Sequence, residues 1–363
     1  MEKKKKIKNM TKLIVTIPVY NEEENLARVI KEVPRRIPGI DRVEVLVFDD
    51  GSTDQSRDIA KVAGADYVFY HHHNKGLAIT FKDALWTALK LQADFIVNTD
   101  GDNHYDQSRI PDLVKPLLTS GADITVGSRR VAELEYMPFW NKYLNRLGSF
   151  ILTKWVGLPA LDVSSGFRGY TKEAALRLGV YSLHTYVHTT LLSAQDSNLN
   201  IIEVPIKARP VSRKSRLIKN IPSHLWKAGL NIVRNIALFR PLRFFGFTAG
   251  VLFVLGIVPI IRFVFYFLAN EGNGHIQSLI LAGVLVILSF NSLMLGLLGS
   301  SLGWSRKVNE EVLYFLKKRV LARAEQPYHP QFNNTNQQKE NQAYSVLDQE
   351  KIKERLKSLG YLD

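Results

Sequence analysis

Two aspartates separated by a single glycine, Asp100 and Asp102, directly follow an apolar run of the sequence. Two carboxylates this close repel each other unless a cation lies between them, and hard divalent ions such as Mg²⁺ or Mn²⁺ prefer oxygen ligands. An ion held there could bridge a diphosphate and take up the charge that develops as a nucleotide departs. His104 is a candidate third ligand. The Asp-x-Asp pattern alone often marks only a turn, so its position at the end of a predicted strand is what favours a metal site.

A second polar cluster begins at Asp50, which ends another apolar run before Gly51 and Ser52. A carboxylate there could accept hydrogen bonds from a ribose hydroxyl or a base, or it could cap the next helix. Gly76 allows close approach of a ligand to the backbone in the same region. The three consecutive histidines at 71–73 are not expected to form a metal site, because successive side chains point in different directions.

These residues have to be positioned by strands and helices that alternate along the chain. Apolar, β-branched runs predict strands, and the segments between them have helical periodicity. The predicted strands are 12–20, 42–50, 65–71, 93–100 and 122–129, and the predicted helices are 22–33, 53–62, 77–91 and 108–118. Alternation of this kind predicts an α/β fold with a mostly parallel sheet covered by helices on both faces. Asn21 followed by Glu24 predicts a capping arrangement at the first helix.

The polar residues lie at the carboxyl ends of these predicted strands, and ligands of open parallel sheets bind outside that edge. We therefore expect Asp50, Gly76 and the Asp100–Asp102 pair to converge. The sequence has neither a GxGxxG fingerprint after its first strand nor a GxxxxGK[ST] loop. A nucleotide would have to be held by other groups.

Two long apolar runs predict a membrane-spanning hairpin. Residues 244–261 and 277–304 contain no charged side chain, and each run can cross a hydrocarbon layer of about 30 Å. Basic residues flank the outer ends of the pair, whereas the link 270–275 has no Lys or Arg, so both ends are expected in the cytoplasm. The alternative is a buried hairpin of a soluble protein. Residues 221–239 have the pattern of an amphipathic helix in the membrane surface, with packing on the globular part as the alternative.

Composition narrows the chemistry further. The chain has 48 Lys and Arg against 34 Asp and Glu, a net charge of +14, which would attract phosphates on a nucleotide, a nucleic acid or an anionic lipid. It has no Cys, which excludes disulfides, Cys-based zinc sites and thiol catalysis. The basic residues near the N-terminus are not followed by an apolar stretch and cleavage site, so no secretory signal is expected and the N-terminus should be cytoplasmic.

The chain resembles the family 2 inverting glycosyltransferases of GT-A fold in six motifs, which occur in this order: TIPVYNEEENL, VLVFDDGSTDQS, NTDGDNHYD, ITVGSRR, DVSSGFRGY and IIEVPI. The resemblance spans Leu13 to about Leu217 and is greatest with polyprenyl-phosphate sugar transferases similar to dolichol-phosphate mannose synthase. It implies a GT-A type nucleotide-diphospho-sugar transferase domain at 12–217, after a basic tail at 1–11. The juxtamembrane helix would then be 218–243, the hairpin 244–304 with spans at about 244–268 and 277–303, and a cytoplasmic tail 305–363.

The resemblance also implies roles for individual residues. The donor's base and ribose would be bound by Pro18, Tyr20, Glu22 and Asp50, with Gly76 beside them. The metal and diphosphate would be bound by Asp100, Asp102 and His104, where His104 replaces the family's usual Gln. The acceptor phosphate would be bound by Arg129, Ser165, Arg168 and the basic run 212–216 with Arg213 and Lys214, and residues 141–149 fit a further phosphate motif only loosely. His188 and Thr189 stand where many relatives have a Glu.

We hypothesise that a polyprenyl phosphate oxygen attacks the sugar with inversion, with Asp102 essential through the metal. A phosphate monoester has its second pKa near about 6, so a strong base is unnecessary. Asp162 is the one acid retained as a possible base or acceptor-orienting group. The expected partners are a UDP- or GDP-sugar, a dolichyl or undecaprenyl phosphate and membrane lipids, with no nucleic acid and a possible homo-oligomer, in a prokaryotic plasma membrane rather than the endoplasmic reticulum.

Other functions predict other features. A processive polysaccharide synthase would carry QxxRW and more spans, and a sugar nucleotidyltransferase would need a Gly-rich loop after its first strand; the sequence has neither motif. A membrane-anchored transferase with a non-polyprenyl acceptor stays open. So does a non-catalytic membrane scaffold that binds nucleotide sugar. Turnover with and without a lipid phosphate would distinguish these two from the favoured reading.

Overall fold

The computed structural model describes residues 10–129, 162–180, 186–206, 209, 233–234, 236–268 and 276–325. Its strands are β1 (Lys12–Val19), β2 (Arg42–Asp49), β3 (Tyr67–Tyr70), β4 (Phe95–Asn98), β5 (Ile124–Ser128), β6 (Arg168–Thr171) and β7 (Ile201–Pro205). Its helices are α1 (Leu26–Glu32), α2 (Ser56–Val62), α3 (Leu77–Lys90), the short 3₁₀ helix η1 (Gln107–Arg109), α4 (Ile110–Thr119), α6 (Lys172–Arg177), α7 (Val187–Asp196), α9 (Pro241–Leu268) and α10 (Ile276–Glu325). All five predicted strands are present, and each ends within two residues of its predicted bounds.

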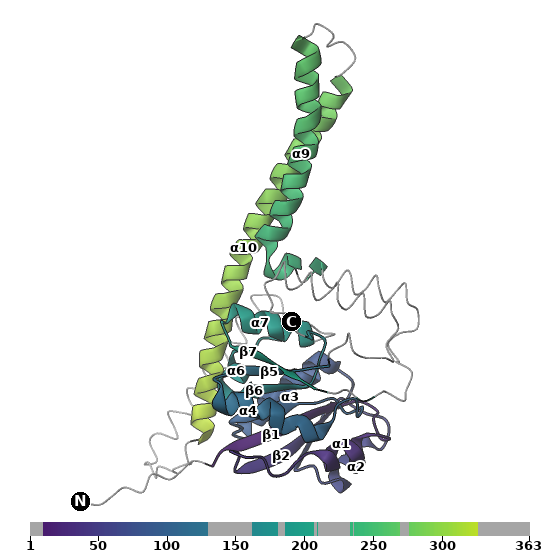
Figure 1. Cartoon of the computed structure of the whole chain (residues 1–363), viewed down its shortest axis with the longest axis vertical. Coiled ribbons are helices and arrows are strands. Elements are labelled where there is room, and N and C mark those ends of the chain that lie inside the picture. Colours follow the sequence, from purple (N-terminus) through teal and green to yellow (C-terminus); the bar gives the residue numbers. More distant parts are fainter. Residues whose placement is uncertain are drawn as a thin grey trace, which may run out of the picture. The chain divides into compact units, whose positions relative to one another are not determined.

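The strands form one sheet in the order β3-β2-β1-β4-β6-β5-β7 (Figure 1). Every neighbouring pair is parallel except those made by β6, which is antiparallel to both β4 and β5. The predicted α/β fold with a mostly parallel sheet is therefore confirmed. The chain order reverses between β1 and β4, and such a switch point is where open α/β sheets bind ligands.

The antiparallel strand β6 brings a distant segment to this switch point. Its first residue, Arg168, pairs with Asn98 at the end of β4 and with Val126 of β5. An antiparallel strand begins at the edge where its parallel neighbours end. Residues 162–167 therefore reach the edge that also carries Asp100.

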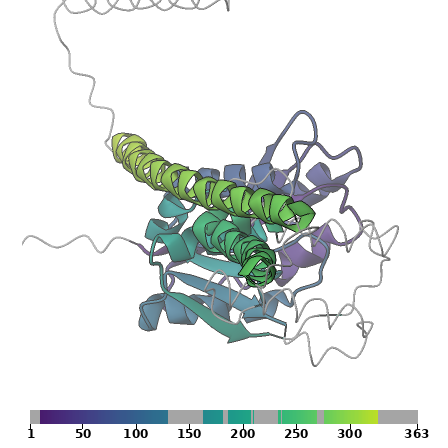
Figure 2. The same ribbon diagram turned by 90° about the horizontal axis from the view of Figure 1, so that it is seen from above.

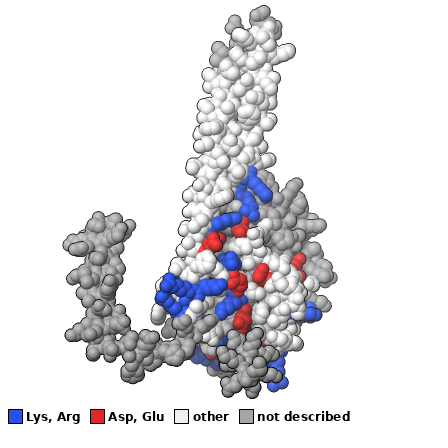
Figure 3. Space-filling model, turned by 90° about the vertical axis from the view of Figure 1, so that its left-hand side faces the viewer, with Lys and Arg blue, Asp and Glu red and all other residues white. Residues whose placement is uncertain are grey.

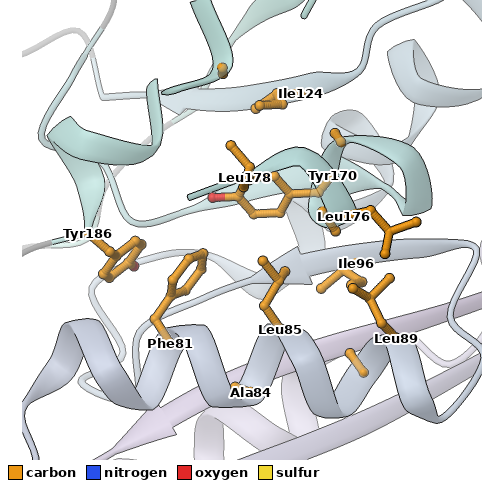
Figure 4. Packing of buried hydrophobic residues seen from close by; sticks show 14 of the residues in the cluster. Phe81, Ala84, Leu85, Leu89, Ile96, Ile124, Tyr170, Leu176, Leu178 and Tyr186 are labelled. Atoms are coloured by element: carbon orange, nitrogen blue, oxygen red, sulfur yellow. The ribbon is translucent and has the colours of Figure 1, made fainter. Parts of the chain in front are cut away.

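Two apolar layers hold the sheet. Along β1, Leu13, Val15 and Ile17 are buried in one cluster, whereas Ile14 belongs to the other, as the two-residue period of a strand requires. In the cluster that contains Ile14, helix α3 lies against β4, β6 and α6 (Figure 4). There the rings of Phe81 and Tyr186 stack with centroids 3.9 Å apart.

One local prediction was wrong. The first helix begins at Leu26 instead of residue 22, and its N-cap, Asn25, makes no side-chain capping bond. Asn21 instead has a positive φ of 55°, and its side-chain oxygen accepts a hydrogen bond from the Thr53 amide at 2.9 Å. Asn21 thus joins the ends of β1 and β2 and does not cap α1 with Glu24.

Helices α9 and α10 are long and apolar enough to cross a membrane, judged by length and composition, and only 6% and 22% of their most apolar windows are buried. They lie side by side (Figures 1 and 2), with the Ser289 hydroxyl donating to the Ala249 carbonyl at 2.8 Å and Ser292 to the Phe245 carbonyl at 3.0 Å. Figure 3 shows an apolar column without acidic or basic side chains on the face in view, above a zone where both gather.

Helix α10 continues beyond residue 304, the predicted end of the hairpin, to Glu325. Tyr314 and Leu321 of this continuation are buried in the cluster that includes Leu176 and Leu178. The division of the chain into domains stays a prediction. Most of the predicted surface helix 221–239 lies outside the described residues.

Candidate active site

The Asp100–Gly101–Asp102 turn follows β4 at the switch point and packs on the end of β1. A Cβ added at Gly101 would lie 3.7 Å from the Pro18 carbonyl oxygen and 3.8 Å from Cβ of Glu22. The structure therefore brings Pro18 and Glu22 beside the aspartate pair. Their contact with the donor stays a prediction. Tyr20, next to them in sequence, keeps 42% of its surface exposed, so its ring is open to solvent at the same edge.

The electrostatics of this turn suit a cation. Burial and the negative charge of Asp102 together raise the pKa of Asp100 to about 7, and the charges of Arg129 and Arg168 offset only part of the effect. A positive ion between the carboxylates would remove this penalty. Among the described residues no cluster of three or more His, Asp or Glu side chains is placed to hold an ion. Two carboxylates nevertheless fit Mg²⁺, which commonly takes one or two from the protein and the rest of its ligands from substrate phosphates and water.

His104 follows Asp102 by two residues and contacts it through its backbone. Its backbone amide donates to Oδ1 of Asp102 at 3.0 Å, and its ring stands edge-on to Tyr105 at 5.1 Å. Burial lowers the pKa of His104, only partly countered by Asp102. Its Nδ1 is buried and has no hydrogen-bond partner among the described residues. A neutral imidazole with such an atom suits a bound ion or a donor contact, and its role as a ligand stays a prediction.

Arg209 fixes the loop that carries these groups, and no sequence motif marks this residue. Its backbone amide donates to the His104 carbonyl at 2.9 Å. Its guanidinium donates to Asn103 at 2.7 Å, to Asp106 at 3.1 Å and to Glu32 at 2.6 Å. Asn103 has a positive φ of 60°, a conformation that needs support from its surroundings. Arg209 therefore holds the loop 103–106 in place.

Asp50 organises a second loop. Its carboxylate is buried and accepts hydrogen bonds from the backbone amides of Lys75 and Gly76, both at 2.9 Å, and from Nδ1 of His71 at 2.9 Å. Nε2 of His71 in turn lies 3.1 Å from Asp83. Gly76 has a φ of 94°, which favours glycine there. Asp50 is not the cap of α2, whose N-cap is Gln55; its contact with a ribose or base stays a prediction.

Arg129 and Asp162 form a bidentate ion pair beside the aspartate turn. The guanidinium donates to both carboxylate oxygens, at 2.6 and 2.9 Å, and Ser164 donates to the same carboxylate at 2.8 Å. Burial alone would raise the pKa of Asp162, but the hydrogen bonds and charge of Arg129 outweigh it and leave the pKa below its ordinary value. A carboxylate in this state is a weak base.

Arg168 and Ser165, two predicted acceptor contacts, are fully buried. The guanidinium of Arg168 donates to the carbonyls of Val187 at 2.7 Å and Val163 at 3.1 Å, and to the Thr190 hydroxyl at 2.8 Å. In this arrangement Arg168 joins α7 to the segment before β6, and its contact with a phosphate stays a prediction. Arg213, Lys214 and residues 141–149 lie outside the described residues.

Gly166 lies against Asp100 and is held by contacts that the sequence analysis did not identify. Its amide donates to the Tyr105 hydroxyl at 3.0 Å, and its carbonyl accepts from Asn98 at 3.0 Å. The same Asn98 amide donates to the Tyr186 hydroxyl at 2.9 Å. A Cβ at Gly166 would lie 2.9 Å from both carboxylate oxygens of Asp100. The glycine thus lets Asp100 lie directly against the backbone.

His188 is partly buried in the first turn of α7. Burial and, to a smaller extent, the positive charge of Arg168 lower its pKa to about 4. A neutral imidazole therefore stands where the resemblance leads one to expect an acid.

Comparisons with known proteins place this geometry among sugar transferases. The family model described as glycosyl transferase family 2 matches residues 14–179. The UDP-N-acetylglucosamine–dolichyl-phosphate N-acetylglucosaminyltransferase of Methanococcus voltae is 30% identical over 217 residues, which cover 54% of this chain and 84% of that protein. The polyprenol monophosphomannose synthase of Mycolicibacterium smegmatis is 26% identical over 207 residues, 53% of this chain and 76% of that one.

A solved structure shows the same fold. Glucosyl-3-phosphoglycerate synthase from Mycobacterium tuberculosis, in complex with Mn²⁺, UDP-glucose and phosphoglyceric acid, superposes with a TM-score of 0.50 at 20% identity. The match covers 63% of this chain and 79% of the other. The predicted GT-A fold is thereby confirmed.

Proposed function

The chain belongs to glycosyl transferase family 2 and is a glycosyltransferase, and we propose that it transfers a sugar, with inversion, from a nucleoside diphosphate to a polyprenyl phosphate at the cytoplasmic membrane face. The observation that carries the proposal is the paired carboxylates of Asp100 and Asp102 at the switch point of a chain that also has two membrane-length helices. The names of the two relatives, which specify dolichyl phosphate and polyprenol, support a lipid phosphate acceptor.

Asp100 and Asp102 would hold Mg²⁺ or Mn²⁺ together with the donor diphosphate. The ion would supply positive charge to the departing nucleotide. The raised pKa of Asp100 supports this assignment, because burial and the charge of Asp102 disfavour its ionised form and a bound cation would stabilise that form. Pro18 and Glu22 border the turn and would contact the donor.

No general base is required of the protein. The acceptor phosphate is already largely ionised at neutral pH, so the protein's task is to position it and to offset its charge. Asp162 has a lowered pKa and both of its oxygens on Arg129. We therefore assign Asp162 the orienting role and not that of the base: it holds Arg129 at the site, where the guanidinium offsets the phosphate's charge.

The membrane orientation follows from charge. Arg240 and Arg243 precede the first span and Arg306 and Lys307 follow the second, so the positive-inside rule puts the transferase domain and both ends of the hairpin in the cytoplasm. A lipid phosphate in the inner leaflet would then be on the same side as the donor.

Radiolabelled UDP- and GDP-sugars, screened against vesicles that contain the protein with and without polyprenyl phosphate, test the proposal. We expect a labelled lipid that requires both polyprenyl phosphate and Mn²⁺ or Mg²⁺. Asp102→Ala should abolish formation of this labelled lipid. Asp58→Ala is the control: the Asp58 side chain is 81% exposed and pairs with Lys61, so this variant should keep the activity. Product that forms without the lipid phosphate, or near wild-type transfer by Asp102→Ala, would contradict the proposal.

A further inference from the structure

Asp196 lies at a position where an acid is unfavourable unless it is compensated. It is the last residue of α7, and the carbonyl end of a helix favours cations over anions. Its side chain is only 4% exposed, and a buried carboxylate is costly without charged partners. The proposed reaction assigns no task to this residue.

Two arginines compensate Asp196, one from each end of the hairpin. Arg240 donates to Oδ1 at 3.0 Å and Arg306 donates to Oδ2 at 2.9 Å. The guanidinium of Arg306 also stacks on the ring of Phe239 at 4.2 Å. We call Asp196, Arg240 and Arg306 the Asp196 clamp.

The arginines of the clamp are rigid parts of the two apolar helices. The amide of Phe244, in the first turn of α9, donates to the Arg240 carbonyl at 3.1 Å, so Arg240 moves with α9. Arg306 lies within α10, two residues after the apolar run ends at Trp304. One carboxylate thus holds both helices at the level where their apolar segments end.

A second contact fixes the angle of α10. Lys317 donates to the carbonyls of Leu176 at 3.2 Å and Leu178 at 3.4 Å, at the end of α6. It lies eleven residues after Arg306, or about 16 Å along a helix. Two contacts at this separation define the direction of the helix as well as its position.

The other end of α7 belongs to the candidate active site. The Val187 carbonyl and the Thr190 hydroxyl accept hydrogen bonds from Arg168, and the neighbouring Tyr186 hydroxyl accepts one from Asn98. Helix α7 has ten residues and is therefore about 15 Å long. A displacement of the hairpin against Asp196 would reach the site through this short helix.

We propose that Asp196 is a positioning residue that holds the transferase site at a fixed distance and orientation from the bilayer, through Arg240 and Arg306. The inference rests on the proposed function, because it matters only if the acceptor is embedded in the membrane. Transfer to a membrane-embedded lipid phosphate should depend on the clamp, whereas nucleotide binding should not.

The test compares two acceptors in the full-length protein reconstituted in phosphatidylcholine vesicles: a long polyprenyl phosphate in the bilayer and a ten-carbon isoprenyl phosphate added from water. For Asp196→Asn we expect transfer to the long lipid to fall at least about tenfold, because misplacement by 1 Å can cost as much as about 100-fold. Transfer to the short acceptor and the Kd of the nucleoside diphosphate with Mn²⁺ should each stay within about twofold of wild type. The melting temperature should stay within a few degrees of wild type. Arg306→Gln should show the same selectivity in weaker form, and Asp58→Asn should show none.

An equal loss with both acceptors, or a loss of nucleotide affinity alongside it, would overturn the inference and reduce Asp196 to a residue that stabilises the fold. Unchanged transfer to the long lipid would overturn it as well. Should Asp196→Asn fail to accumulate, Arg306→Gln gives the same comparison. If the wild type does not use the short acceptor, the nucleotide Kd and the melting temperature replace it as the measurements that should not change. A wild type that makes no lipid product at all would instead refute the proposed function.

Discussion

Gly166 offers a sensitive test of the geometry around the aspartate pair. A methyl group at this position would lie 2.8 Å from the Tyr186 hydroxyl and 2.9 Å from both carboxylate oxygens of Asp100. Non-bonded carbon contacts lie near about 3.5 Å, so Gly166→Ala has to move its neighbours by roughly half an ångström. The Tyr186 hydroxyl is held by Asn98 at 2.9 Å, so Asp100 is expected to take up most of the movement.

The magnitude follows from that displacement. If a misplacement of 1 Å can cost about 100-fold in rate, half of it should cost about tenfold. The half-saturating Mn²⁺ concentration should rise as well, because one of the two proposed ligands has moved. Overpacking typically costs about 1–3 kcal/mol in stability. Initial rates of sugar transfer over a Mn²⁺ titration, together with urea unfolding, measure all three quantities.

Gly169→Ala is the matched control in the same strand region. Its added Cβ would lie 2.5 Å from the Thr125 hydroxyl and 3.0 Å from Cδ1 of Leu117, away from Asp100. It should therefore destabilise the fold without a change in Mn²⁺ dependence. If Gly166→Ala keeps the Mn²⁺ dependence of wild type, or if both variants change it equally, Asp100 is not the group that the glycine accommodates at a metal site.

Two further predictions concern Arg209 and Asp162. Arg209→Gln should raise the half-saturating Mn²⁺ concentration several-fold, because the loop 103–106 loses the hydrogen bonds that Arg209 donates to it. Arg28→Gln removes the other partner of Glu32 and should leave that concentration unchanged. Equal behaviour of the two variants would refute the role of Arg209 in holding the loop. The lowered pKa of Asp162 contributes stability above the unfolded value of about 4 and loses it as the pH falls through the folded value. Asp162→Asn should therefore lower the free energy of unfolding at pH 7 and flatten its decline below about pH 4 in urea titrations; a decline as steep as that of wild type would show that another carboxylate is responsible.

The sequence identified the strands well because their signal is local. Runs such as residues 12–19 and 42–49 are apolar, β-branched and bounded by polar turns, and the structure pairs them in register from Lys12 with Arg42 to Val19 with Asp49. The position of Pro18 and Glu22 beside the Asp100–Asp102 turn has the same origin, since parallel strands end at one edge of the sheet.

The parts that the sequence did not reveal depend on contacts between distant segments. Arg209 lies more than 100 residues from Asn103, and its role depends on a fold that brings β7 near that loop. The Asp196 clamp joins residues 44 and 110 positions apart. The local pattern around Asn21 fits a helix cap. In the structure its side-chain oxygen instead accepts a hydrogen bond from the Thr53 amide on the neighbouring loop.

Binding of Mn²⁺, followed by electron paramagnetic resonance with a nucleoside diphosphate present and absent, tests most directly whether Asp100 and Asp102 hold an ion with the donor. We expect nucleotide-dependent Mn²⁺ binding by wild type and none by Asp102→Ala, with the variant still folded and in the membrane. Binding that Asp102→Ala retains, or no binding by wild type with the nucleotide present, would contradict the proposed mechanism.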